Sequence, residues 1–202
     1  MTKRERDILR NLGLELAEAA KDPVNAERRR VCENVDARRK SRPCIAISQE
    51  PWHELNVNGE LDIRCQDSFC RGLEQDMRRK LYKWRHYPGD MTVAADSVQP
   101  YCIRSTGFGI EEQVDVARTS ADSDVVSRHF HIQIRDESDM AKIREPVVTH
   151  DAAATEEGYQ KRGEIFDGIL AVRKSGVGSF WFAPWDHLVR LTGVEAVLTD
   201  MV

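Results

Sequence analysis

Carboxylate and imidazole side chains gather at three places where the sequence predicts the end of a strand or helix: "QEPWHELN", "HYPGD" and "PWDH". Acid and imidazole groups at one rim of a sheet can protonate or deprotonate a substrate. Neighbouring indole rings can exclude water and shift the pKa values of those groups. We therefore expect Glu50, His53 and Asp90 to be catalytic. The expected substrate-binding residues are Trp52, Glu54, His86, Asp96, Trp185, Asp186 and His187.

The alternative for "QEPWHELN" is a surface loop in which Pro51 begins a helix. The alternative for each Trp is simple packing in a core or under a loop. Both alternatives stay open at the level of sequence.

Cysteine and histidine spacing predicts no metal site in this chain. Cys65 and Cys70 lack the second pair or nearby His that would complete a tetrahedral zinc site. His129 and His131 share one face of a strand, but no third ligand follows, so packing on a solvated face is favoured. The five cysteines are odd in number and irregularly spaced, so we expect free thiols in a reducing, cytoplasmic setting rather than a disulfide framework.

Composition and missing motifs exclude several classes of function. The chain has 202 residues, 41% hydrophobic and 32% charged, which suits one sizeable domain, and no apolar run reaches membrane-spanning length. The charged start of the chain has no signal-peptide core. No phosphate-binding G-x-x-x-x-G-K-[ST], helix-opening G-x-G-x-x-G or G-x-S-x-G elbow is present. The basic clusters "ERRR" and "ARRKSR" interleave with acids and lack stacking aromatics, so nucleic acid is not an expected partner.

The hydrophobic pattern alternates helices with short strands. A capping box at Thr2 and Glu5 opens a helix up to about residue 20, and a regular apolar stripe predicts another from 67 to 86. A further helix is expected at 23–40 and another from about 149 to 168. Strands are expected at 42–48, 91–95, 169–174 and near 179, and alternating residues in the middle third predict a β-ribbon. This order indicates an α/β protein with a largely parallel sheet.

Several segments carry a resemblance to a known family. They are "RPCIAISQEPWHEL", "RRKLYKWRHYPGDMTV", "REPVVTHDAAATEE", "EIFDGILAVR" and "FWFAPWDHLVRLTGVEAVLTDMV". In this order they resemble the N-terminal half of bacterial proteins of the uroporphyrinogen decarboxylase superfamily, especially the branch grouped with corrinoid-dependent methyltransferases. The resemblance implies a partial (β/α)8 barrel in residues 42–202, preceded by a helical extension in 1–41. It also implies a corrinoid and a zinc ion, the zinc ligands lying in a C-terminal half that we expect to be missing from this chain.

Three functions follow from these features. The leading expectation is a methyltransferase that moves a methyl group from a small O- or N-methylated compound to a corrinoid protein. The second is decarboxylation of a tetrapyrrole; it is disfavoured because the first loop lacks the Arg that family decarboxylases use, although Asp90 or Asp96 could take the place of their conserved Asp. The third is a non-catalytic half-barrel that needs a partner chain or pairs with another copy of itself. No membrane partner is expected.

Overall fold

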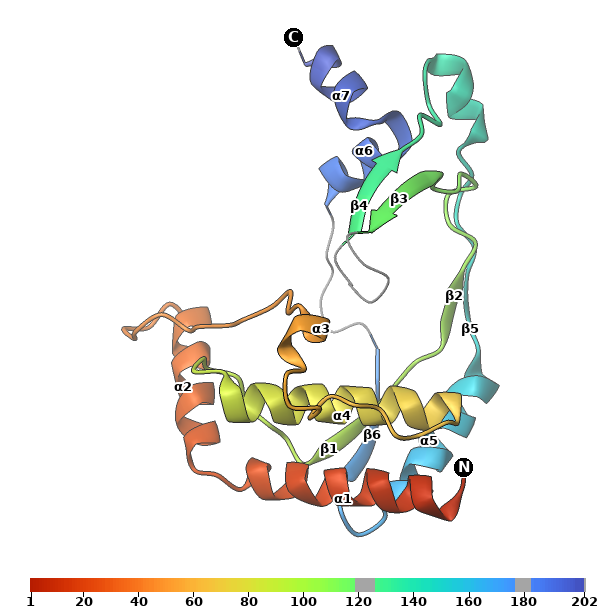
Figure 1. Cartoon of the computed structure of the whole chain (residues 1–202). Coiled ribbons are helices and arrows are strands. Elements are labelled where there is room, and N and C mark those ends of the chain that lie inside the picture. The colour runs from red at the N-terminus through yellow and green to blue at the C-terminus, as the bar shows by residue number, and fades with distance from the viewer. Residues whose placement is uncertain (119–125, 177–182, 202) are drawn as a thin grey trace. The chain divides into compact units, whose positions relative to one another are not determined.

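The computed structural model describes residues 1–118, 126–176 and 183–201 (Figure 1). The chain divides into two compact units. The first comprises residues 1–99 and 156–174, and the second comprises 100–155 and 175–202. No helix among the described residues is long and apolar enough to cross a membrane.

Two long helices build the core of the first unit. Helix α1 (Lys3–Ala20) begins with the predicted capping box, in which the Thr2 side chain accepts from the Glu5 amide and the Glu5 side chain accepts from the Thr2 amide. Helix α4 (Ser68–His86) begins at Asp67, whose side chain accepts from the Cys70 amide. The helices pack against each other, and their apolar stripes are buried together: Leu9, Leu12, Leu16, Leu73, Met77 and Leu81. Both predicted helices are confirmed.

A parallel strand pair completes the first unit. Strand β1 (Asp96–Pro100) pairs with β6 (Ala171–Ser175). The Ala171 amide donates to the Ala95 carbonyl at one end and the Tyr101 amide to the Ser175 carbonyl at the other, so the strands run in the same direction. Helix α5 (Ala152–Phe166) leads into β6. Its Arg162 donates to the buried side chains of Ser97 and Gln99 on β1.

The predicted strand at 42–48 is wrong. Residues 42–48 form no strand, and the side chains of Ile45 and Ile47 are exposed. The Ile45 amide donates to the side chain of Asp90 instead of to a neighbouring strand. The strand expected at 91–95 starts only at Asp96. Helix α2 (Val24–Asp36) ends before residue 40, the predicted end, and a single short turn, α3 (Trp52–Leu55), follows.

The second unit holds two antiparallel ribbons. Strand β2 (Ile103–Ser105) pairs with β5 (Val148–His150). Strand β3 (Val114–Arg118) pairs with β4 (Val126–Phe130), which confirms the predicted ribbon in the middle third. The remaining elements are the short helix η1 (Glu137–Lys142) and helices α6 (Pro184–Thr192) and α7 (Val194–Asp200).

The chain mixes helix and strand as predicted, but its described residues form three two-stranded sheets and no closed barrel. The strand expected near 179 lies outside the described residues. Helix α1, within the extension predicted at 1–41, shares its core with α4.

Candidate functional site

The C-terminal half of α4 gathers part of the predicted site. Positions 82 and 86 lie four apart and therefore share a face of the helix, and the rings of Tyr82 and His86 contact each other at a tilt of 45° with centroids 4.4 Å apart. The Tyr82 hydroxyl donates to the carbonyl of Leu55 at 3.1 Å, which fixes α3 next to this face. We call the residues joined here the α4 cluster: Glu50, Trp52, Glu60, Tyr82, Lys83, His86 and Tyr87.

Glu50 enters the α4 cluster through an ion pair. Its half-buried carboxylate accepts a short hydrogen bond from Lys83 Nζ, which also donates to the Ile47 carbonyl at 2.9 Å. Burial opposes ionisation of Glu50, but the bond from Lys83 and its positive charge outweigh it and lower the pKa of Glu50. Glu50 is therefore ionised at neutral pH, which suits it to orient a ligand by charge and not to deliver a proton.

Trp52 supplies an aromatic face beside Tyr82. The two rings meet edge to face with centroids 6.2 Å apart. The guanidinium of Arg79 lies 5.0 Å from the centre of the Trp52 ring, a cation–π distance. The other two predicted residues on α3, His53 and Glu54, are exposed.

His86 is held by an acid that the sequence did not single out. Its Nε2 lies 3.0 Å from Glu60 Oε1, and Arg85 also pairs with Glu60. The hydrogen bond with His86, together with the charges of His86 and Arg85, lowers the pKa of Glu60. The imidazole thus has an ionised carboxylate to orient it.

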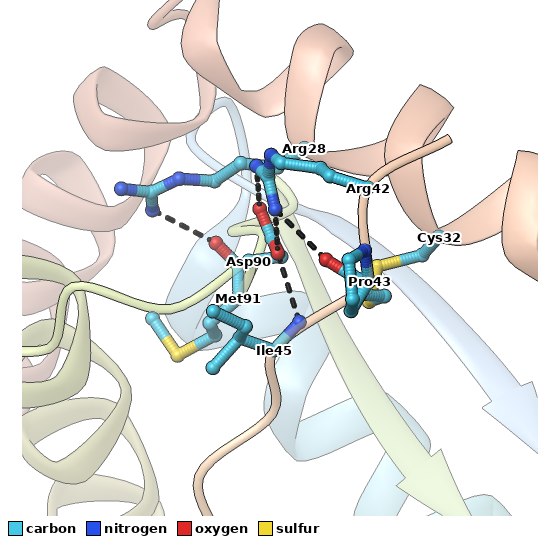
Figure 2. Close-up of a disulfide and its surroundings, with 8 residues drawn as sticks. Arg28, Cys32, Arg42, Pro43, Ile45, Asp90 and Met91 are labelled. Atoms are coloured by element: carbon cyan, nitrogen blue, oxygen red, sulfur yellow. Dashed lines mark hydrogen bonds and ion pairs between the residues drawn. A yellow bond between two sulfur atoms is a disulfide. The ribbon is translucent and has the colours of Figure 1, made fainter.

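Asp90 lies in a different environment and serves as an anchor. Figure 2 shows its carboxylate between Arg42 and the backbone of Ile45. Arg42 donates two hydrogen bonds to it, at 2.6 and 2.5 Å, and the Ile45 amide donates a third at 2.9 Å. These bonds, led by those from Arg42, lower the pKa of Asp90 to about 2. The Asp90 carboxylate therefore holds the segment of Arg42 and Ile45 in place.

The other predicted site residues do not join the α4 cluster. Asp96 pairs with Arg173 at 2.7 Å across β1 and β6. Trp185, Asp186 and His187 occupy the exposed first turn of α6, in the second unit. His131 pairs with Asp115 at 3.0 Å on the β3–β4 ribbon, and among the described residues no group of three His, Cys, Asp or Glu side chains could hold a metal.

The expectation of free thiols is wrong for two of the five cysteines. Cys32 and Cys44 form a disulfide, whereas Cys65, Cys70 and Cys102 are not disulfide-bonded. Sequence spacing gave no signal for this pair, because it does not show that the irregular segment after α2 folds back against the helix. Glu60, Tyr82 and Lys83 were also missed, since their roles depend on partners distant in sequence.

Acid should weaken the protein through Asp90 and Glu5. Both have their pKa lowered to about 2, Glu5 mainly by the amides of Asp67, Thr2 and Gln66. A lowered folded-state pKa contributes stability that is present above the unfolded value of about 4 and lost as pH falls toward about 2. We expect the free energy of unfolding, measured with urea between pH 5 and 2, to fall less steeply in Asp90→Asn and in Glu5→Gln. In each variant the slope against pH should correspond to about one proton fewer. Unchanged slopes in both variants would contradict these anchors.

Comparison with known proteins finds no family model, no curated protein and no solved structure that matches this chain. The resemblance to the uroporphyrinogen decarboxylase superfamily therefore stays a prediction.

Proposed function

We propose that this chain supplies the N-terminal part of a barrel-type methyltransferase of the uroporphyrinogen decarboxylase superfamily, moving a methyl group from a small O- or N-methylated compound to a corrinoid protein. The observation that carries the proposal is the α4 cluster. Two segments that carry the resemblance, "RPCIAISQEPWHEL" and "RRKLYKWRHYPGDMTV", meet in it through the Glu50–Lys83 ion pair and the Trp52–Tyr82 contact.

The chemistry of the α4 cluster suits such a donor. Aromatic rings attract methylated ammonium groups, and the Trp52 and Tyr82 rings, which meet edge to face, are proposed to contact the methyl group beside Arg79. Departure of the methyl group from an oxygen or an uncharged nitrogen requires a proton for the leaving atom. His86, oriented by Glu60, and the exposed His53 are the groups proposed to supply it. Glu50 is proposed to orient the donor, and Asp90 to hold the segment that precedes Glu50.

Only the resemblance to the family implies a zinc ion and a corrinoid for this chain. The described residues provide no three-ligand group for a metal, so none of the roles given above involves zinc. The corrinoid enters as the methyl acceptor, carried by a partner protein.

The proposal is tested by incubating the full-length product of the gene that encodes this chain with cob(I)alamin and two panels of donors, methyl ethers and methylated amines. We expect methylcobalamin, followed by its absorbance, to form at least about tenfold faster than without protein for one panel. No acceleration with either panel would contradict the proposal. Formation of coproporphyrinogen from uroporphyrinogen in a parallel assay would favour decarboxylation instead.

A second candidate, a half-barrel that pairs with another copy, is favoured by a specific observation. Large apolar side chains are exposed on α6 and α7: Trp185, Leu188, Val194 and Leu198. Such a patch marks an interaction surface when it is contiguous. Light scattering coupled to gel filtration is expected to show a dimer or larger assembly, and Leu188→Lys with Leu198→Lys is expected to shift it to the monomer. A wild-type monomer at high micromolar concentration would contradict this candidate.

A further inference from the structure

The Cys32–Cys44 disulfide joins the C-terminal half of α2 to the irregular segment that follows it. The two cysteines are 12 residues apart and their Cα atoms lie 5.0 Å from each other. Both residues are half-buried, so a reductant in solution can reach the bond. Figure 2 shows the disulfide next to Pro43, on the opposite side of the segment from Met91.

A second fastening lies beside the disulfide, on the same segment. Arg42 and the Ile45 amide both donate to Asp90, and the Asp90 amide donates back to the Ile45 carbonyl at 2.7 Å. The Asp90 side chain is 4% exposed, whereas Arg42 is 51% exposed. The two backbones approach so closely that a Cβ on Gly89 would lie 2.9 Å from the Ile45 carbonyl oxygen, a contact that only glycine avoids.

The same stretch around Asp90 is also fixed to α2. Arg28 donates to the Met91 carbonyl at 3.0 Å, and the buried Asn25 accepts from the Val93 amide at 2.8 Å. Helix α2, the Asp90 stretch and the Ile45 segment therefore form a closed ring of contacts. The disulfide is its one covalent link among the described residues apart from the backbone.

We propose that the Cys32–Cys44 disulfide and the Asp90 anchor form a redox-sensitive latch on the segment 37–47. When the disulfide is intact, Cys44 cannot leave α2, so an opened Asp90 anchor closes again at once. When a dithiol reduces the bond, its two thiols become a disulfide and Cys32 and Cys44 each take up an electron and a proton as free thiols. The segment is then held by the Asp90 anchor alone and opens more often.

The latch acts on the chain that leads into the α4 cluster. Lys83 holds both the Ile47 carbonyl and Glu50, immediately after the latched segment. Opening of the segment therefore loosens the attachment of Glu50 to α4. This inference does not depend on the proposed function, because backbone opening can be measured without substrate.

Amide hydrogen exchange of the oxidised and dithiothreitol-reduced protein tests the latch. We expect reduction to raise exchange of the Ile45 and Asp90 amides by about tenfold or more, while amides inside α4 between Leu73 and Met77 keep their protection. Cys32→Ser with Cys44→Ser should reproduce the reduced protein without any reductant. If that variant does not fold, reduced wild type still gives the comparison.

Asp90→Asn provides the matched control for the second fastening. In oxidised protein its effect on Ile45 exchange is expected to be small, and after reduction it should exceed the product of the two separate effects. Equal exchange in oxidised and reduced wild type would overturn the proposal. So would alkylation of all five cysteines in protein that was unfolded without reductant. In the unfolded, unreduced protein only the three cysteines outside the disulfide should react: Cys65, Cys70 and Cys102.

Discussion

Replacing Glu74 by leucine is expected to destabilise the protein by about 3–5 kcal/mol, because it leaves a charge and two amides without their partner. The Glu74 side chain is fully buried on α4 and pairs with Arg78, which is only 12% exposed. It also accepts from the amides of Arg64 and Cys65 at 2.9 and 2.8 Å. Burial opposes its ionisation, yet these hydrogen bonds outweigh burial and lower the pKa of Glu74.

A matched control for Glu74 lies on the same helix. Asp76 and Lys80 form an i, i+4 pair at 2.7 Å, but both are about half exposed. Urea unfolding of Asp76→Leu should show a loss of only about 0.3–0.5 kcal/mol. Similar losses of unfolding free energy for Glu74→Leu and Asp76→Leu would contradict the prediction that the buried Glu74–Arg78 pair contributes more than the exposed Asp76–Lys80 pair.

Truncating Phe166 is expected to cost a similar amount. Phe166 is fully buried at the end of α5, and its ring packs so close to α1 that a Cβ on Gly13 would lie 3.2 Å from it. Phe166→Ala removes this ring and leaves a cavity, at a cost of about 3–5 kcal/mol in urea unfolding. The exposed Phe108, 57% accessible, is the control, and its replacement by Ala should change stability by no more than about 0.5 kcal/mol. Equal losses would place Phe166 outside the core.

Local signals were enough to predict the helices of the first unit. The capping box at Thr2 and the leucines spaced along α1 are contained within one segment, and so is the apolar stripe of α4. The β3–β4 ribbon was likewise predictable from alternation. These features do not depend on partners distant in sequence, because the period of apolar residues within the segment decides which face is buried.

The segment 42–48 shows why other features could not be predicted. Its apolar residues suggested a buried strand, but a strand needs a neighbour to pair with, and here the Ile45 amide finds the carboxylate of Asp90, 45 residues away. The Cys32–Cys44 disulfide likewise requires the segment after α2 to fold back against that helix, which residue spacing does not show. For Glu74 the sequence does contain a signal, because an acid within the buried apolar stripe of α4 predicts a buried partner of opposite charge.

Residue types predicted which side chains belong to the candidate site, but not which partners hold them. Sequence reasoning selected Glu50, Trp52 and His86, and the structure brings these three to one face of α4. It did not foresee Lys83 and Glu60, which hold Glu50 and His86. The ion pair with Lys83 is the reason that Glu50 is ionised rather than poised as an acid.

A pair of tryptophan variants tests whether the α4 cluster holds the methyl donor. Trp52 and Trp84 are both half-buried in the first unit, and each has an arginine 5.0 Å from its ring centre. Only Trp52 belongs to the α4 cluster. In the methylcobalamin assay, Trp52→Leu is expected to raise KM for the donor by about tenfold, the loss of one aromatic contact. Trp84→Leu, with its fold checked by circular dichroism, should change KM by less than about twofold. Equal KM values for the Trp52 variant and the wild type would show that the α4 cluster does not hold the donor.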